Sequence, residues 1–298
     1  MASSTTLQRS LELAGTLPAL MVAADRVAAT VIQGVHGRRR VGQGDAFWQF
    51  RPYRDGDSAT QIDWRQSARS RHLFVRETEW EAAASVWLWR DASPSMNYAS
   101  LRGIDTKAVR AELIALAVAS LLSDAGERVS VLGSGMRPIS GRVAVRRVAE
   151  HLFDETRENM PTPASLPPLI PLPAHGSVVL VSDWLDPLDR IEDVIRHYAS
   201  AGVRGHIVQV LDPAEEDLPF NGHVKFEGLE NEGQHPIRRV EAVRAAYSAR
   251  LAAQRDGLQR LARPANWTVH LHRTDRPPQT VLLALYLAMA DLGRLNAA

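Results

Sequence analysis

Asp91, Ser93 and Ser95 are the residues of this chain whose types and spacing could do chemistry. They directly follow a short apolar run, residues 86–89, that is typical of a buried strand. At the carboxyl end of a strand in an open α/β sheet, a carboxylate and two hydroxyls at this spacing can all face the crevice in which such sheets bind ligands. Mg²⁺ prefers oxygen ligands of this kind, so the spacing predicts half of a divalent-cation site.

A second carboxylate, Asp183, stands at the end of another apolar run, residues 177–182. If this run is strand four of a doubly wound sheet and the first run is strand one, the two strands lie side by side where the strand order reverses. We therefore expect Asp183 to face the same crevice as Asp91 and to complete the cation shell, directly or through water.

The motif over residues 91–95, followed after two more sheet elements by residues 182–183, resembles the metal-ion-dependent adhesion site (MIDAS) of von Willebrand factor A domains. The resemblance implies that Mg²⁺ or Mn²⁺ is the cofactor. It also implies a third direct hydroxyl ligand, a threonine, from the region before strand four. Thr162 is the predicted ligand there, ahead of Thr156 and Ser165.

Aromatic, glycine and charged residues follow one another between residues 44 and 69. Their order resembles the signature of the bacterial family catalogued as domain of unknown function 58 (DUF58), which joins such a signature to a von Willebrand factor A-like domain. The signature residues of this chain are Arg51, Tyr53, Gly56, Asp57, Asp63, Trp64, Arg65 and Arg69. The charged residues among them, Arg51, Asp57, Asp63, Arg65 and Arg69, form either a charged binding surface or an ion-pair network that fixes the segment onto the domain. Interleaved charges neutralise each other locally, which favours the structural alternative.

Composition limits the class of protein. The chain has 298 residues, of which 45% are hydrophobic and 23% charged, as expected for a soluble globular protein of one or two domains. It has no cysteine, which excludes disulfides, thiolate zinc sites and cysteine nucleophiles. His270 and His272 share one strand face without a third ligand nearby, which favours hydrogen-bonded histidines over a zinc site.

A formal net charge of +1 gives no electrostatic argument for binding nucleic acid or an anionic membrane. The short basic segment of residues 34–40 is interpreted as a solvated turn. The sequence opens without the pattern of a signal peptide, and its apolar windows are too short or too interrupted by charge to span a bilayer. These features predict a cytoplasmic protein without a membrane span.

The alternation of apolar runs with helix-like segments predicts an α/β fold, a doubly wound and mostly parallel sheet, and the resemblance makes it one of von Willebrand factor A type. We expect residues 1–80 to form an N-terminal extension, a helical arm plus signature hairpins, packed on the core. Residues 81–298 are expected to be the von Willebrand factor A-like domain, with an inserted β-hairpin within residues 212–240. In that domain, Asp105 is predicted to cap a helix and residues 137–140 to form an edge strand.

These observations favour a non-enzymatic, divalent-metal-dependent protein–protein interaction module. In this hypothesis, the bound cation keeps an open coordination position that takes a carboxylate from a partner protein. Members of the resembled family are commonly linked with AAA+ ATPases of the MoxR type. The resemblance therefore implies that this chain is an adaptor of such an ATPase, or of another protein that presents a carboxylate.

Two alternatives stay open. The first is a metal-dependent phosphohydrolase with Asp91 as the nucleophile, which would need a second carboxylate two positions on and a lysine near the phosphate. Position 93 is serine, which argues against this enzyme. The second alternative is a structural module in which Asp91, Ser93 and Ser95 only cap the next turn and no metal site is occupied.

Overall fold

The structure, a computed structural model, describes residues 21–32, 47–53, 62–70, 72–78, 84–154, 164–230 and 233–295. The chain divides into two compact units. One consists of Met1–Gly34 together with Ala84–Ala298, and the other is Val35–Ala83. The predicted packing of the segment Val35–Ala83 on the core stays a prediction.

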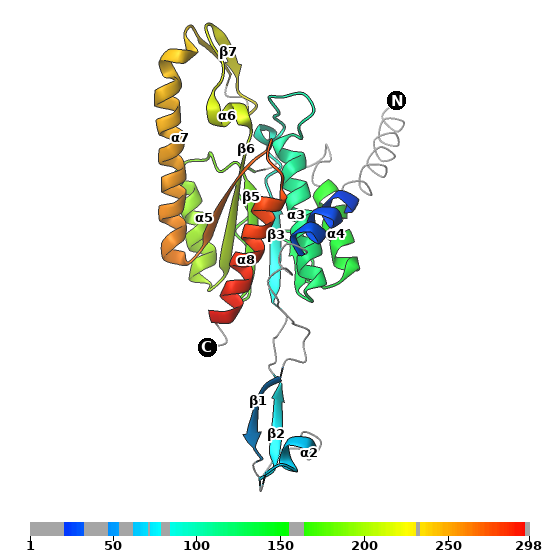
Figure 1. The fold of residues 1–298 in the computed structure, drawn as a ribbon. Helices are drawn as coiled ribbons and strands as arrows, with labels where there is room; N and C mark the ends of the chain where they lie inside the picture. The colour runs from blue at the N-terminus through cyan, green and yellow to red at the C-terminus, as the bar shows by residue number, and fades with distance from the viewer. Residues whose placement is uncertain are drawn as a thin grey trace. The chain divides into compact units, whose positions relative to one another are not determined.

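In the described part of the larger unit, a five-stranded sheet is parallel throughout (Figure 1). The prediction of a mostly parallel α/β sheet is therefore confirmed. The strand order is β4-β3-β5-β6-β9. The strands are β3 (Ser85–Arg90), β4 (Arg128–Val131), β5 (Ser177–Ser182), β6 (Arg204–Leu211) and β9 (Thr268–Arg273).

Strands β3 and β5 lie side by side at the centre of the sheet, with Val86 opposite Ser177 and Arg90 opposite Val181. From β3 the chain crosses to β4 on one side and returns to β5 on the other, so the strand order reverses between β3 and β5. Open α/β sheets bind their ligands at this point, beyond the carboxyl ends of the strands. The two apolar runs of the sequence thus meet where a crevice was expected.

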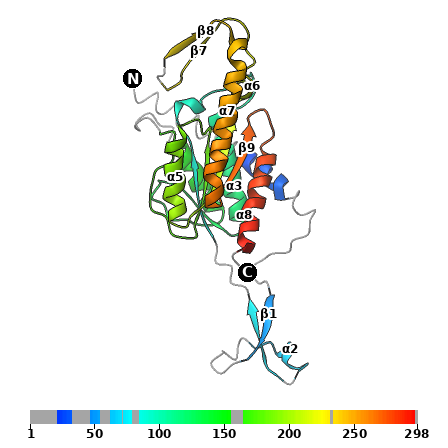
Figure 2. The ribbon, with the colours of Figure 1, turned by 90° about the vertical axis from the view of Figure 1, so that its left-hand side faces the viewer.

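Helices cover both faces of the sheet (Figures 1 and 2). Side chains of β3 explain this, because Val86 and Leu88 belong to one apolar cluster whereas Trp87 and Trp89 belong to another. A strand that is buried on both faces is apolar at successive positions instead of alternating with polar residues. The first cluster includes residues of α3 (Lys107–Asp124), α4 (Arg142–Asp154), α8 (Gln279–Leu295) and the helix over residues 21–32; the second includes residues of α5 (Leu188–Ser200) and α7 (Val240–Ala262).

Two local predictions are wrong. The residue that caps α3 is Thr106, whose hydroxyl accepts a hydrogen bond from the Val109 N–H at 3.3 Å; Asp105 instead pairs with Arg110 at 3.0 Å. The expected edge strand at residues 137–140 is reduced to a single antiparallel bridge between Ile139 and Val129.

The predicted hairpin insertion is present. Strands β7 (Val224–Glu227) and β8 (Gln234–Ile237) pair in antiparallel fashion and follow the short helix α6 (Pro213–Asp217). Figure 2 shows this hairpin near one end of α7. Helix α6 begins with a capping box. The Asp212 carboxylate accepts from the Ala214 N–H at 2.8 Å, and the Glu215 carboxylate accepts from the Asp212 N–H at 2.9 Å.

The smaller unit contains an antiparallel pair, β1 (Phe47–Pro52) and β2 (Phe74–Thr78), and the one-turn helix α2 (Trp64–Ser67). The Asp63 carboxylate caps α2 by accepting a hydrogen bond from the Gln66 N–H at 2.8 Å. Antiparallel strands are thus present where the signature hairpins were expected, and residues 53–73, with α2 among them, separate the two strands. Of the helices that the structure describes in either unit, none is long and apolar enough to cross a membrane.

Candidate cation site at the carboxyl ends of β3 and β5

Asp91 is fully buried directly after β3. Its N–H donates to the Val181 carbonyl at 2.8 Å, which holds it beside β5. One carboxylate oxygen accepts a hydrogen bond from the Ser93 N–H at 2.7 Å, and the other accepts one from the Ser182 hydroxyl at 2.8 Å. Burial raises the pKa of Asp91 to about 6, against the lowering effect of these hydrogen bonds. Burial therefore disfavours the ionised form of this carboxylate, which a neighbouring positive charge would stabilise.

The two serine hydroxyls lie close together beside this carboxylate. Ser93 Oγ and Ser95 Oγ are 3.0 Å apart, and Ser95 Oγ donates to Asp183 Oδ2 at 3.1 Å. Adjacent oxygens around Mg²⁺ are also about 3 Å apart, because each lies about 2.1 Å from the ion along directions at right angles. The spacing of the two hydroxyls, which is also that of a hydrogen bond, is thus compatible with two adjacent positions in a magnesium shell.

Asp183 already has a cationic partner, Lys107, the first residue of α3. Lys107 Nζ donates to Asp183 Oδ2 at 3.0 Å and to Glu215 Oε1 at 2.6 Å, and its side chain is fully buried. Burial alone would lower the pKa of Lys107, but the charges of the two carboxylates raise it above its ordinary value. The ammonium is therefore charged, and it links Asp183, directly after β5, to Glu215 in α6.

Side chains of β6 and α7 support the loop after β5. The Gln209 amide donates to the Asp183 carbonyl at 2.8 Å, and Arg255 donates to Gln209 Oε1 at 3.1 Å. Trp184 adopts a left-handed backbone conformation with φ 54°, is fully buried, and donates from its indole N–H to the Val208 carbonyl at 3.0 Å. These contacts hold the backbone after β5 against β6 and α7.

Lys107 and Glu215 do not appear among the residues predicted from the sequence. Glu215 lies 108 residues beyond Lys107, and only the packing of α6 against the crevice brings the two together. The rarity of lysine in this chain could nevertheless have drawn attention to Lys107. Of the 35 lysine and arginine residues, only Lys107 and Lys225 are lysine. Lysine is a compact point charge, unlike the planar guanidinium that the chain uses elsewhere.

The structure brings four of the predicted site residues together, namely Asp91, Ser93, Ser95 and Asp183. Thr162 lies outside the described residues, as do Gly56 and Asp57 of the signature. The signature residues that the structure describes all belong to the smaller unit, and they are Arg51, Tyr53, Asp63, Trp64, Arg65 and Arg69. Trp64 is 65% exposed.

Within the described ranges, no three or more His, Asp or Glu side chains are grouped so that they could hold a metal ion. A cation in this crevice would therefore depend on hydroxyl ligands beside one or two carboxylates. On β9, the His270 ring shares the Thr268 hydroxyl with His206, at 2.9 Å and 2.8 Å.

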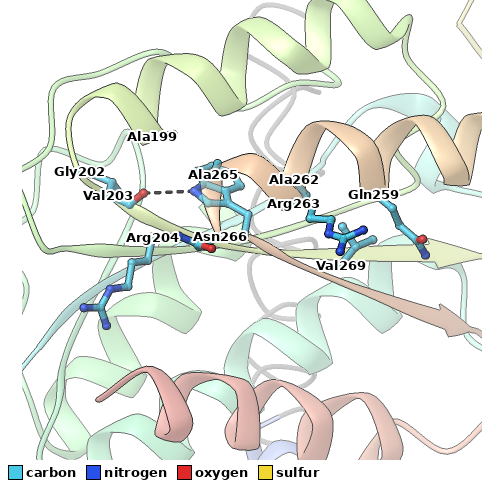
Figure 3. Close-up of a pocket in the computed structure, with 11 residues that line it drawn as sticks. Ala199, Gly202, Val203, Arg204, Gln259, Ala262, Arg263, Ala265, Asn266 and Val269 are labelled. Atoms are coloured by element: carbon cyan, nitrogen blue, oxygen red, sulfur yellow. Dashed lines mark hydrogen bonds between the residues drawn. The ribbon is translucent and has the colours of Figure 1, made fainter. Parts of the chain in front are cut away.

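A pocket of about 700 Å³ lies at the opposite ends of the strands (Figure 3). Its lining includes Arg204 at the start of β6, Arg263 after α7, and Trp267 just before β9. The Trp267 indole N–H donates to the Val203 carbonyl at 3.2 Å, which the dashed line in Figure 3 marks. Because it adjoins the amino ends of β6 and β9, this pocket is separate from the Asp91 crevice.

The fold and the site define a doubly wound α/β protein with a buried cluster of carboxylates, hydroxyls and one ammonium at the carboxyl ends of β3 and β5, where the strand order reverses. Residues 49–257 match the family model described as "Protein of unknown function DUF58", so the chain belongs to this family. It is similar to "Uncharacterized protein Rv1480" of Mycobacterium tuberculosis and "Uncharacterized protein Mb1516" of Mycobacterium bovis, each 26% identical over 282 residues, which cover 89% of this chain and 86% of the relative. No solved structure gives a significant match.

Proposed function

We propose that this protein is a non-enzymatic interaction module of von Willebrand factor A type whose crevice binds Mg²⁺ or Mn²⁺. The observation that supports this most is the pair of serine hydroxyls 3.0 Å apart beside the buried carboxylate of Asp91. When bound, the cation would supply an open position for a carboxylate of a partner protein.

The hydrogen bonds support different roles for the two aspartates in this proposal. Asp183 Oδ2 accepts from both Ser95 and Lys107, and Asp183 Oδ1 accepts from the Leu185 N–H at 3.3 Å. Asp91, by contrast, accepts from the uncharged Ser93 N–H and Ser182 hydroxyl, so its charge is not balanced by an ammonium as that of Asp183 is. Asp91 is therefore the direct ligand, and Asp183 completes the shell through water.

The proposed partner is an AAA+ ATPase of the MoxR type, as the family resemblance implies. A cation held mainly by hydroxyls keeps more of its charge for an incoming ligand than one surrounded by carboxylates. A glutamate or aspartate of the partner would meet this charge in a partly desolvated crevice, where the attraction is stronger than in water.

The phosphohydrolase alternative gains one feature from the structure, since Lys107 places an ammonium beside Asp183. That ammonium is fully buried and bound to two carboxylates, which leaves it unsuited to contact a phosphate. Position 93 still provides a hydroxyl where a general acid would be needed. Both points favour the non-enzymatic module.

Capture of the ATPase by this protein is expected to depend on the metal. In a pull-down, Asp91→Ala and chelation with EDTA should each weaken binding at least about tenfold, or roughly 1.4 kcal/mol, because each removes the cation that bridges the partners. Arg65→Glu, in the exposed signature helix α2, is the control and should bind normally. Equal capture in Mg²⁺ and EDTA, together with loss in Arg65→Glu, would instead assign the contact to the signature surface.

A further inference from the structure

Lys107 occupies a position that only its acidic partners explain. It is the first residue of α3, where the positive end of the helix dipole disfavours a cation. Its ammonium is fully buried, and burying a charged group is unfavourable unless the group is paired. The contacts with Asp183 and Glu215 satisfy this requirement. Lys107 is therefore part of the crevice and not of the helix surface.

The ammonium and the proposed cation compete for the same acidic group. Lys107 Nζ and Ser95 Oγ bind the same oxygen, Asp183 Oδ2, at 3.0 Å and 3.1 Å. A divalent cation held by Ser95 and linked to Asp183 would thus lie a few ångströms from a full positive charge. Two cations this close in a buried site repel each other strongly.

A second carboxylate gives the ammonium another place to bind. Glu215 Oε1 lies 2.6 Å from Lys107 Nζ, closer than Asp183 does. The other Glu215 oxygen accepts from the Asp212 N–H at 2.9 Å in the capping box of α6, which fixes the carboxylate independently of Lys107. Lys107 can therefore release Asp183 and remain paired.

We propose that Lys107 is a tethered competitor of the divalent cation. Without metal, its ammonium neutralises Asp183; when the metal binds, the ammonium leaves Asp183 and stays on Glu215 alone. This inference rests on the proposed metal site and adds its regulation. Because Glu215 lies in α6, metal binding would break the lysine link between the β5 loop and α6, the helix that precedes the β7–β8 hairpin.

Titration of Mn²⁺ by calorimetry tests the competition. Lys107→Met removes the ammonium but keeps a side chain of similar length, so its Mn²⁺ affinity should rise at least about tenfold. Glu215→Gln takes away the second charged partner and holds the ammonium on Asp183, so its affinity should fall several-fold. Lys225→Met, the same substitution at the exposed lysine of β7, is the matched control and should bind like the wild type.

Each outcome separates this inference from the proposed function. Equal affinity in the wild type and Lys107→Met would overturn the competition and leave the metal site standing. Binding only in Lys107→Met would support the competition and overturn the proposal that the native site uses a metal. If Lys107→Met fails to fold, unchanged affinity in Glu215→Gln would overturn the inference. Absence of binding in every folded variant would overturn both.

A second readout follows the ammonium itself. Because the chain has two lysines, lysine-selective isotope labelling gives one side-chain NMR signal for Lys107 and one for Lys225. Saturation of the wild-type protein with diamagnetic Mg²⁺ should shift the Lys107 signal and leave the Lys225 signal in place. A Lys107 signal that stays unchanged when Mg²⁺ is bound would show that the ammonium does not move, which overturns the inference.

Discussion

Gly205→Ala is expected to lower the free energy of unfolding by about 3 kcal/mol or more, or to prevent folding. An added Cβ would lie 1.9 Å from Cδ2 and 2.1 Å from Cε3 of the Trp267 ring. The ring cannot move aside easily, because Trp267 is buried and its indole N–H is bound to the Val203 carbonyl. Strand β6, which contains residue 205, joins β5 to β9, so a shift of its backbone would disturb the centre of the sheet.

Urea unfolding of Gly205→Ala should be compared with that of Gly257→Ala. The Cβ added at residue 257 would meet Leu188 Cδ1 at 2.3 Å, which is the end of a flexible side chain. Leu188 can rotate away, and alanine is also favoured over glycine in the interior of α7 by about 1 kcal/mol. The control should therefore cost less than about 1 kcal/mol. Similar losses in both variants would contradict the close packing of Trp267 on β6.

Glu112→Ala is expected to cost about 3–5 kcal/mol, because it leaves a buried guanidinium without its counter-ion. Arg90 NH2 lies 3.3 Å from Glu112 Oε1, and the two side chains are 1% and 9% exposed. Arg90 also donates to the Leu152 carbonyl and directly precedes Asp91 in the chain.

The matched control for Glu112→Ala is Glu150→Ala, which breaks an exposed ion pair. Glu150 Oε1 lies 3.4 Å from Arg146, and both side chains are more than half exposed. Exposed pairs within one helix contribute only about 0.3–0.5 kcal/mol, so the control should lose little stability. Thermal or urea unfolding measures both variants. Equal losses would mean that the Arg90 guanidinium is solvated and not buried in the folded protein.

The sequence was sufficient to predict the parallel sheet and the meeting of Asp91, Ser93, Ser95 and Asp183, because both depend on local patterns. A continuous apolar run followed by a carboxylate indicates a buried strand with a polar carboxyl end, and this occurs at Asp91 and again at Asp183. The strand-order rule then places the two carboxylates together. The family assignment likewise followed from a motif that is contiguous in the chain.

Features set by tertiary packing could not be predicted. In the sequence, Lys107 looks like an ordinary helix residue, because its partner Glu215 lies 108 residues further along the chain. Only the folded structure brings the two side chains together. Neighbouring capping residues are also hard to separate, since Asp105 and Thr106 both suit the position and only Thr106 takes it. The segment over residues 137–140 looks like a strand, but Gly135 and Gly141 on either side adopt positive φ, which turns the chain and leaves only one bridge to the sheet.

The central claim is that Asp91, Ser93 and Ser95 hold a divalent cation. Its most direct test is a calorimetric titration of chelator-treated protein with Mn²⁺, for the wild type and for Asp91→Ala. We expect a single site in the wild type and loss of binding in Asp91→Ala, because the variant lacks the direct carboxylate ligand. Wild-type protein that binds no Mn²⁺, or an Asp91→Ala variant that binds it as tightly as the wild type, would contradict the account.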